Sequence, residues 1–210
     1  KIVERQFLIK LALLSASIWS MESTNKLFFI SLYFTFRVIN GYSQILAPPI
    51  HYWDFSNGIT PDWTLESSTP IADWEYRGPN TDPDITVCSR GSCGASSVPI
   101  TSITSQNGFV IFDSNYWDDD DGICGGLGTG QDPAPHIASI ITPSVNLSGV
   151  NTVVLTFQQQ YKHYQTTTTK VYVSNNNGNS WTQVLANSGV FSANSEWKTV
   201  NVTAQAAGFT

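Results

Sequence analysis

The chain has 210 residues, of which 41% are hydrophobic, and carries 10 Lys or Arg against 16 Asp or Glu, a formal net charge of −6. This acidic balance argues against nucleic acid and against anionic membrane surfaces as partners, because both attract basic proteins. Residues 44–210 are more acidic still, with five basic and fourteen acidic side chains, whereas residues 1–43 are basic.

The first part of the chain predicts a leader. The only methionine is Met21, so residues 1–20 are interpreted as an upstream extension to which no fold is assigned. After Met21, a short polar stretch precedes a ten-residue apolar stretch, 27–36, interrupted only by Ser31 and Thr35. This stretch is too short to span a bilayer and is typical of a secretory signal peptide. Residues 21–43 are therefore predicted to direct export.

Small residues mark the expected cleavage site of this signal peptide. Gly41 and Ser43 stand at the positions where small residues favour cleavage, which is predicted before Gln44. The alternative is an uncleaved anchor, which Arg37 weakens. The 167 residues that follow are enough for one domain with a substantial core, and they show no transmembrane run.

Short β-branched or aromatic runs follow, separated by clusters of Gly, Pro, Asn and Ser, and this pattern is typical of an all-β domain. Nine such runs predict a β-sandwich or jelly roll of two antiparallel sheets. The candidate strands are 50–55, 63–65, 74–76, 108–112, 136–141, 152–161, 170–174, 182–185 and 197–202.

The second half of the chain shows the clearest strand pattern. Apolar and mixed residues alternate over 153–158, so one face of this strand is expected to be buried. The step from Asn177 to Gly178 favours positive φ and predicts a hairpin turn. Trp181, at the start of the return strand, is expected to pack inward, with a ligand-binding platform as the alternative.

An acidic run follows the apolar strand 109–112. Asp113 and residues 118–121 place five carboxylates within nine residues. Because closely spaced like charges repel, either these side chains spread into solvent or a cation holds some of them. Asp113, directly at the strand end, is the candidate for metal binding or loop ordering, and residues 118–121 are expected on a solvated, ligand-facing loop.

Two aromatic residues lie beside this acidic run. Tyr116 and Trp117, with Asp118 and Asp119, form a candidate ligand site, because an aromatic face flanked by carboxylates can bind a sugar ring. The alternative is an aromatic plug that seals one end of the sandwich.

The three cysteines indicate export rather than zinc binding. Cys88 and Cys93 lie five residues apart and are predicted to form a disulfide that closes a small loop. Cys124 is left over, and the sequence does not decide whether it stays free, pairs beyond this chain or displaces one of the first two. The three histidines show no ligand spacing typical of a zinc site.

Several short motifs then occur in a specific order: Trp53-Asp54-Phe55, Pro61-Asp62-Trp63, Asp73-Trp74 with Arg77, residues 81–86, Asn107-Gly108-Phe109, residues 138–143 and 154–161, Gly178-Asn179-Ser180-Trp181, and Ser195-Glu196-Trp197. Together they resemble the MAM domain, an extracellular jelly-roll adhesion module, and in particular the MAM-like modules of secreted bacterial surface proteins. The resemblance spans about residues 52–202.

The chain also departs from this family. Ser56 replaces the usual acidic residue after the first-strand Phe, and the cysteines do not stand at the family's disulfide positions. Family modules end with further strands, so we expect residues 52–210, after a linker at 44–51, to form a concanavalin-like jelly roll without its last strands.

The resemblance implies a binding domain rather than an enzyme. Independently, the chain shows neither the alternating Glu and Asp run of sandwich glycosidases nor a Gly-x-Ser-x-Gly elbow. The resemblance also brings the first strand and several loops together, which predicts a calcium site that consists of Asp54, Asp82, Asp84 and Asp113.

The expected function is non-catalytic adhesion or recognition by a secreted or cell-surface protein. Its expected partner is a glycan or a surface protein, with Ca²⁺ as the candidate cofactor and no membrane insertion of the mature module. The alternative is a carbohydrate-binding module attached to a secreted hydrolase.

Overall fold

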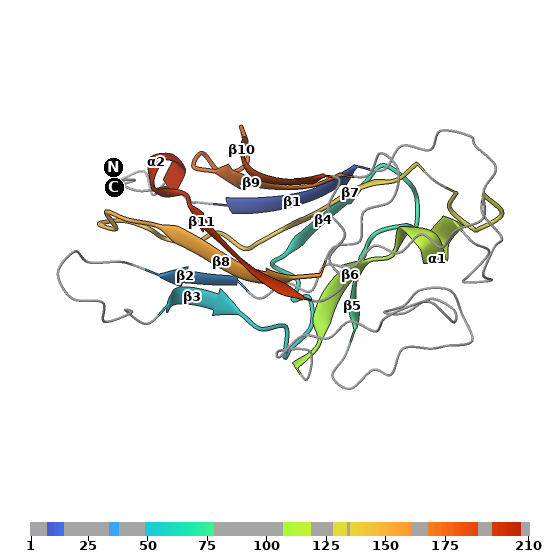
Figure 1. Cartoon of the computed structure of the whole chain (residues 1–210), viewed down its shortest axis with the longest axis horizontal. Coiled ribbons are helices and arrows are strands. Elements are labelled where there is room, and N and C mark those ends of the chain that lie inside the picture. The colour runs from blue at the N-terminus through green and yellow to red at the C-terminus, as the bar shows by residue number, and fades with distance from the viewer. Residues whose placement is uncertain are drawn as a thin grey trace.

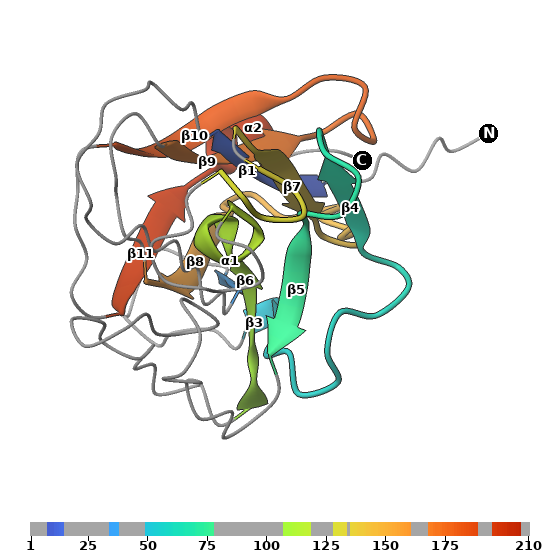
Figure 2. The same cartoon turned by 90° about the vertical axis from the view of Figure 1, so that its right-hand side faces the viewer.

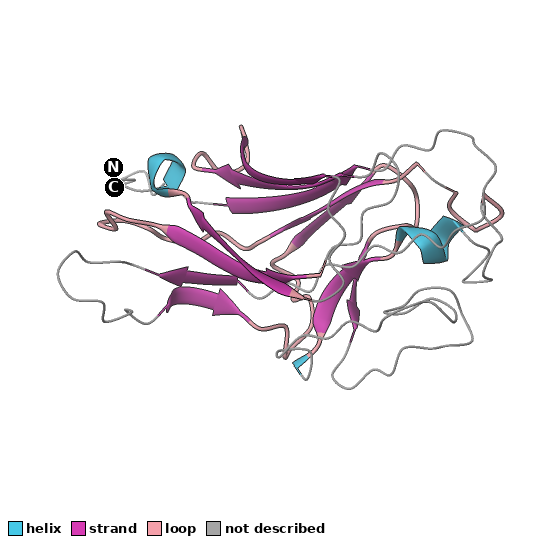
Figure 3. Ribbon diagram, in the orientation of Figure 1, coloured by secondary structure: helices cyan, strands magenta, loops and turns pink. Residues whose placement is uncertain are grey.

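The computed structural model describes residues 8–14, 34–37, 49–77, 107–118, 128–133, 135–160, 168–188 and 195–206. Strands dominate these residues, and both helices are short (Figure 3). The strands are β1 (Leu8–Leu14), β2 (Phe34–Arg37), β3 (Pro49–Trp53), β4 (Thr64–Ser67), β5 (Trp74–Arg77), β6 (Phe109–Phe112), β7 (Ile137–Ile141), β8 (Val154–Gln159), β9 (Thr168–Ser174), β10 (Thr182–Ser188) and β11 (Glu196–Asn201). The helices are α1 (Ser114–Asp118) and α2 (Thr203–Ala206).

The strands form two main sheets and one smaller pair. A five-stranded sheet has the order β10-β9-β1-β7-β4, a four-stranded sheet has the order β11-β8-β2-β3, and β5 pairs with β6. All of these pairings are antiparallel. Figure 1 shows the five-stranded sheet above the four-stranded one, with α1 and α2 at opposite ends of the longest axis. The predicted all-β fold of antiparallel sheets is confirmed.

Each of the nine predicted strands corresponds to an observed strand, β3 to β11, with boundaries that differ by a few residues. The largest difference is at the end of β10. β10 continues three residues beyond the predicted 182–185 to Ser188. Boundaries are the least certain part of such predictions because terminal residues contribute little to the periodic pattern.

The apolar core lies between the two main sheets and extends to β5 and β6. Alternate residues of a strand point to opposite faces of its sheet, so β8 contributes Leu155 and Phe157 while β9 contributes Val171 and Val173. Fully burying each such side chain contributes about 1.5–3 kcal/mol. The core also contains residues from β5, β6 and β7, namely Trp74, Val110, Phe112, Ala138 and Ile140.

The predicted hairpin joins β9 to β10. Asn177 and Gly178 both have positive φ, at 58° and 80°, as a tight turn requires. The Asn176 side chain accepts a hydrogen bond from the Ser180 backbone N–H at 2.9 Å, and the Ser174 hydroxyl accepts one from the Gly178 N–H at 2.9 Å. This turn therefore has a defined shape, which matters for the site described below.

Two strands come from segments that were predicted to lie outside the domain. β1, within the extension of residues 1–20, lies between β7 and β9, and β2, within the predicted signal peptide, lies between β3 and β8. This differs from the expectation that residues 1–20 have no fold. For β2 the physical reason is that a short apolar run satisfies the pattern of a signal peptide and that of a buried strand equally well. For β1 the expectation depended only on its position before Met21, which carries no information about strand pairing. Cleavage before Gln44 stays a prediction.

At one end of the molecule, β5 and β6 lie side by side and α1 follows β6 directly (Figure 2). Gly108, just before β6, has φ of +94°, and a Cβ placed on it would lie 2.5 Å from the Tyr76 ring. Both the backbone conformation and the close approach of Tyr76 therefore require glycine here.

We predict that Phe157→Ala lowers the free energy of unfolding by about 3–5 kcal/mol, the range for removing a large buried aromatic side chain. Phe157 is 0% exposed at the centre of the core. Thr156→Ala, a half-buried neighbour on the same strand, is the control and should cost about 1 kcal/mol or less. Urea denaturation followed by circular dichroism measures both. Equal losses for the two variants would contradict this placement of the core.

Candidate functional site

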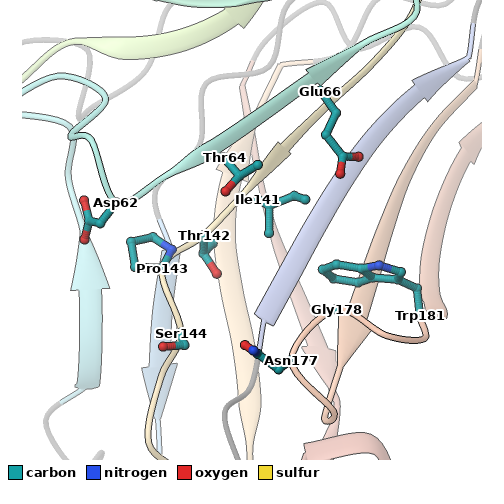
Figure 4. A pocket seen from close by; sticks show the side chains of 10 residues that line it. All are labelled: Asp62, Thr64, Glu66, Ile141, Thr142, Pro143, Ser144, Asn177, Gly178 and Trp181. Atoms are coloured by element: carbon teal, nitrogen blue, oxygen red, sulfur yellow. The ribbon is translucent and has the colours of Figure 1, made fainter.

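A groove of about 310 Å³ opens on the five-stranded sheet, and three chain segments line it (Figure 4). The segments are the start of β4, the end of β7 with the turn after it, and the turn between β9 and β10. The lining residues are Asp62, Thr64, Glu66, Ile141, Thr142, Pro143, Ser144, Asn177, Gly178 and Trp181.

The pairing of β4 with β7 positions one wall of the groove. Thr64 lies opposite Ile141, and Glu66 lies opposite Ser139. Because Thr64 and Glu66 are two residues apart on one strand, both point to the same face of the sheet. Ile140 points the other way into the core, so this wall stands on the outer face of the five-stranded sheet.

The β9–β10 turn positions the opposite wall. Asn177 and Gly178 form the tip of the turn, and Trp181 follows just before β10. Trp181 is half-buried and is not part of the core cluster of the described residues. The inward packing expected for Trp181 therefore gives way to the alternative position, on the surface of a groove. In Figure 4 its indole and the Glu66 carboxylate face the same opening, from segments on either side of β1.

The groove is polar and acidic. Asp62 and Glu66 are both exposed, and Asp62 accepts a hydrogen bond from the Thr60 hydroxyl. The lining also contains the hydroxyls of Thr64, Thr142 and Ser144, and none of the ten lining residues is basic. Carboxylates accept hydrogen bonds and hydroxyls donate or accept them. An indole face beside such groups matches a ligand that has many hydroxyls and one flat apolar side.

A second polar cluster is buried near α1. The Ser114 Oγ lies 2.8 Å from His136 Nδ1, and His136 Nε2 lies 2.6 Å from the backbone oxygen of Asp132. A carbonyl oxygen only accepts, so Nε2 carries a proton and donates it; in the neutral imidazole Nδ1 then accepts from the Ser114 hydroxyl. Both side chains are buried.

The Asp132 carboxylate accepts hydrogen bonds from the backbone of the segment before β5. Its Oδ2 accepts hydrogen bonds from the N–H groups of Ile71 and Ala72, at 3.1 and 2.7 Å. Asp132 therefore does not orient the imidazole of His136 through its carboxylate, as a catalytic triad would require. The cluster joins the segment before β5, the start of α1 and the segment before β7, and its geometry supports a structural role.

The predicted aromatic site lies within α1 and has a different shape from a flat platform. The Tyr116 and Trp117 rings are 5.1 Å apart at an interplanar angle of 81°, so they cannot present coplanar faces to one sugar. Trp117 packs against the core cluster, and Asp118 is buried, with its backbone oxygen accepting from the N–H groups of Gly128 and Gly130. Asp119 lies outside the described residues. This arrangement favours the plug interpretation.

Two of the four predicted metal ligands lie in the described residues. The Asp54 carboxylate accepts from the Ser56 N–H at 3.0 Å and from the Ser56 hydroxyl at 2.7 Å. Asp113 is buried, and its Oδ1 accepts from the Tyr116 N–H at 3.2 Å at the start of α1. Asp82 and Asp84 lie outside the described residues, as do the predicted disulfide partners Cys88 and Cys93.

Within the described ranges, no three His, Cys, Asp or Glu side chains are grouped so that they could hold a metal ion. Neither helix in this part of the chain has the length and apolar character needed to cross a membrane.

Comparisons with protein-family models, with curated proteins and with solved structures found no match to this chain. The resemblance of residues 52–202 to MAM domains thus depends on the motifs quoted above. The groove was not predicted from the sequence, where its only signal is Trp181 beside a hairpin turn.

We predict that acid lowers the stability of the protein through Asp132. Burial by itself raises the pKa of this carboxyl, but the N–H groups of Ala72 and Ile71, the Thr69 hydroxyl and His136 together hold the pKa below its ordinary value of 3.8. A carboxyl with a lowered pKa stabilises the folded state above about pH 4, and this stabilisation is lost as the pH falls through the folded-state pKa.

Asp132→Asn tests this pH dependence, because it keeps an acceptor oxygen but removes the titration. The free energy of unfolding of the variant should be lower at pH 7 and should fall less between pH 5 and pH 2.5 than that of the natural chain. Urea denaturation at a series of pH values measures both curves. Parallel curves for the two proteins would contradict the role given to Asp132.

Proposed function

We propose that this chain is an exported, non-catalytic recognition module with a jelly-roll, MAM-like fold, and that it binds glycans at the groove between β4, β7 and the β9–β10 turn. The observation that carries this proposal is the groove itself, where an indole, two carboxylates and several hydroxyls line about 310 Å³ of open space. The two stacked antiparallel sheets support the jelly-roll assignment, and the apolar stretch 27–36 supports export.

The chemistry of the lining favours a glycan over a hydrophobic ligand. Small-molecule pockets for apolar ligands are lined mostly by apolar and aromatic side chains, whereas Ile141, Pro143 and Trp181 are the apolar minority here. A pyranose ring offers C–H groups on one side, which suit the negative face of an indole, and hydroxyls around its edge, which suit carboxylates. An anionic sugar would be repelled by Asp62 and Glu66, so the expected ligand is neutral or cationic.

The same groove fits the alternative function, a carbohydrate-binding module attached to a secreted hydrolase. The two functions share the ligand class and differ in what the module is joined to. The buried Ser114 and His136 do not lie in the groove lining, so a glycan bound in the groove would not contact them.

We predict that Trp181→Ala weakens glycan binding at least tenfold, since the indole is the main apolar contact of the groove, and tenfold corresponds to about 1.4 kcal/mol. A glycan array identifies the best-bound neutral or cationic glycan, and isothermal titration with that glycan measures the dissociation constant. Trp197→Ala is the matched control, because Trp197 is 45% exposed and lies on β11 in the other sheet.

Trp117→Ala distinguishes glycan binding at this groove from binding at the aromatic site in α1. If the plug interpretation holds, Trp117→Ala lowers the melting temperature and leaves glycan affinity per folded molecule unchanged. Equal binding by natural chain and Trp181→Ala, or absence of binding to every glycan on the array, would overturn the proposed function.

Calcium is proposed as a stabilising cofactor through Asp113 with Asp54, Asp82 and Asp84. We predict that millimolar Ca²⁺ raises the melting temperature of the natural chain and not that of Asp113→Ala. Because Asp113 also accepts a hydrogen bond at the start of α1, the variant is expected to be less stable without calcium, and the informative quantity is the calcium-dependent shift. No shift in the natural chain would contradict the calcium proposal.

A further inference from the structure

Two asparagines of the chain stand in the acceptor sequence for N-linked glycosylation, Asn-x-Ser or Asn-x-Thr with x other than proline. They are Asn146, in Asn146-Leu147-Ser148, and Asn201, in Asn201-Val202-Thr203. No other asparagine of the chain has serine or threonine two residues later. Because an attached glycan is bulky and polar, it fits the fold only where the asparagine lies at the surface. The structure therefore tests both positions.

Both acceptor sequences combine an exposed asparagine with a buried middle residue. Asn146 lies between β7 and β8, Asn201 is the last residue of β11, and both are exposed. In contrast, Leu147 is 2% exposed and Val202 is 0% exposed, and both belong to the core cluster. The middle residue thus holds each segment against the core, and a glycan on the asparagine requires no core side chain to move.

The hydrogen bonds of the two asparagines leave the amide nitrogen available. The Oδ1 of Asn146 accepts from the Ser148 N–H at 2.9 Å, and the Oδ1 of Asn201 accepts from the Thr203 N–H at 3.0 Å. Within the described ranges, Nδ2 of neither asparagine donates a hydrogen bond. Nδ2 is the atom to which an N-linked glycan is attached, so attachment at either position breaks no hydrogen bond of the fold.

Several other asparagines use Nδ2 to hold the fold together. Asn175 Nδ2 donates to the backbone oxygen of Gln205 at 3.0 Å, and Asn179 Nδ2 donates to that of Asn176 at 2.7 Å. The Nδ2 of Asn187 donates two hydrogen bonds and is buried. A glycan on any of these nitrogens would compete with such partners, whereas the asparagines of the two acceptor sequences are exempt from this conflict.

Both acceptor sequences adjoin the segment that leads into β8. The Val202 N–H donates to the backbone oxygen of Val153 at 3.0 Å, and the Thr203 hydroxyl accepts from the Val153 N–H at 3.0 Å. Asn146 belongs to the same connection between β7 and β8. Asn201 is followed directly by α2, at the opposite end of the molecule from α1 (Figure 1).

We propose that Asn146 and Asn201 are N-glycosylation sites of the exported chain. The donor is an oligosaccharide carried on a lipid diphosphate, and Nδ2 of the asparagine attacks its C1 carbon. The N–C1 bond forms, the bond from C1 to the diphosphate oxygen breaks with its electron pair on the leaving lipid diphosphate, and one Nδ2 proton passes to a base of the transferase. The proposal rests on the export that the proposed function includes, and it does not depend on the glycan-binding groove.

The experiment translates the full chain in the presence of microsomes, with a signal peptide of known function placed before Lys1 so that entry does not require the chain's own leader. We expect the chains protected from added protease to carry two glycans. An amidase that releases N-linked glycans converts each modified asparagine into aspartate, and mass spectrometry should locate this change at positions 146 and 201. Asn146→Gln and Asn201→Gln should each lose one glycan.

Three further variants provide matched controls. Ser148→Ala keeps Asn146 but removes the hydroxyl that the acceptor sequence requires, and Ser148 is exposed, so the fold should be retained while the glycan at Asn146 is lost. Ser148→Thr preserves the acceptor sequence and should keep both glycans. Asn151→Gln changes an exposed asparagine outside any acceptor sequence and should also keep both.

Protected chains that lack the glycan at Asn146 or at Asn201 would overturn the assignment of that site. A glycan that persists at Asn146 in Ser148→Ala would overturn the role of the acceptor sequence. The same translation without the added signal peptide tests export separately. If chains are protected and glycosylated only when that peptide is present, export by residues 21–43 is wrong while the two glycosylation sites stand.

Discussion

The constraint on which this structure depends is the burial of one apolar face of each main sheet against the other. Phe157 and Leu155 on one side, and Ile140 and Val171 on the other, are fully or almost fully removed from water. Because side chains alternate along a strand, fixing the inward residues also fixes the outward ones. Thr64 and Glu66 thus stand on the outer face beside Ile141, where the groove forms.

Much of the fold could be predicted from the sequence because its strands carry local signals. The nine strands from β3 to β11 each contain a β-branched or aromatic run bounded by turn residues, and such local signals do not require knowledge of the partner strand. The turn at Asn177 and Gly178 could be predicted for the same reason, since its positive φ angles follow from residue type.

The rest depended on information that local patterns do not contain. The apolar run 27–36 carries no mark that distinguishes a removable leader from a strand of the domain. The place of Leu8–Leu14 in its sheet depends on pairing with residues more than 120 positions away. The groove, too, could not be predicted from local patterns. Asp62, Thr142 and Asn177 come from three distant segments that only the antiparallel register and the hairpin turn bring together.

The acidic stretch shows that residue type alone does not predict whether a carboxylate is exposed. By sequence Asp113 and Asp118 belong to one run of negative charge, yet both are buried and surrounded by their own chain. Asp113 caps α1, and the Asp118 backbone oxygen receives two glycine N–H groups. The backbone at Gly130 approaches the backbone of Trp117 so closely that a Cβ would lie 2.0 Å from the Trp117 oxygen. Asp113 and Asp118 are therefore part of a tightly packed segment around α1.

The turn between β9 and β10 has a consequence for how this protein can change. The side chains of Asn176 and Ser174 hold its shape from within, and its tip residues are not part of the core cluster. Substitutions at the tip can therefore reshape one wall of the groove without altering the packing between the sheets. A lineage of such proteins could diversify its ligands at this turn while its folding stability stayed under separate selection.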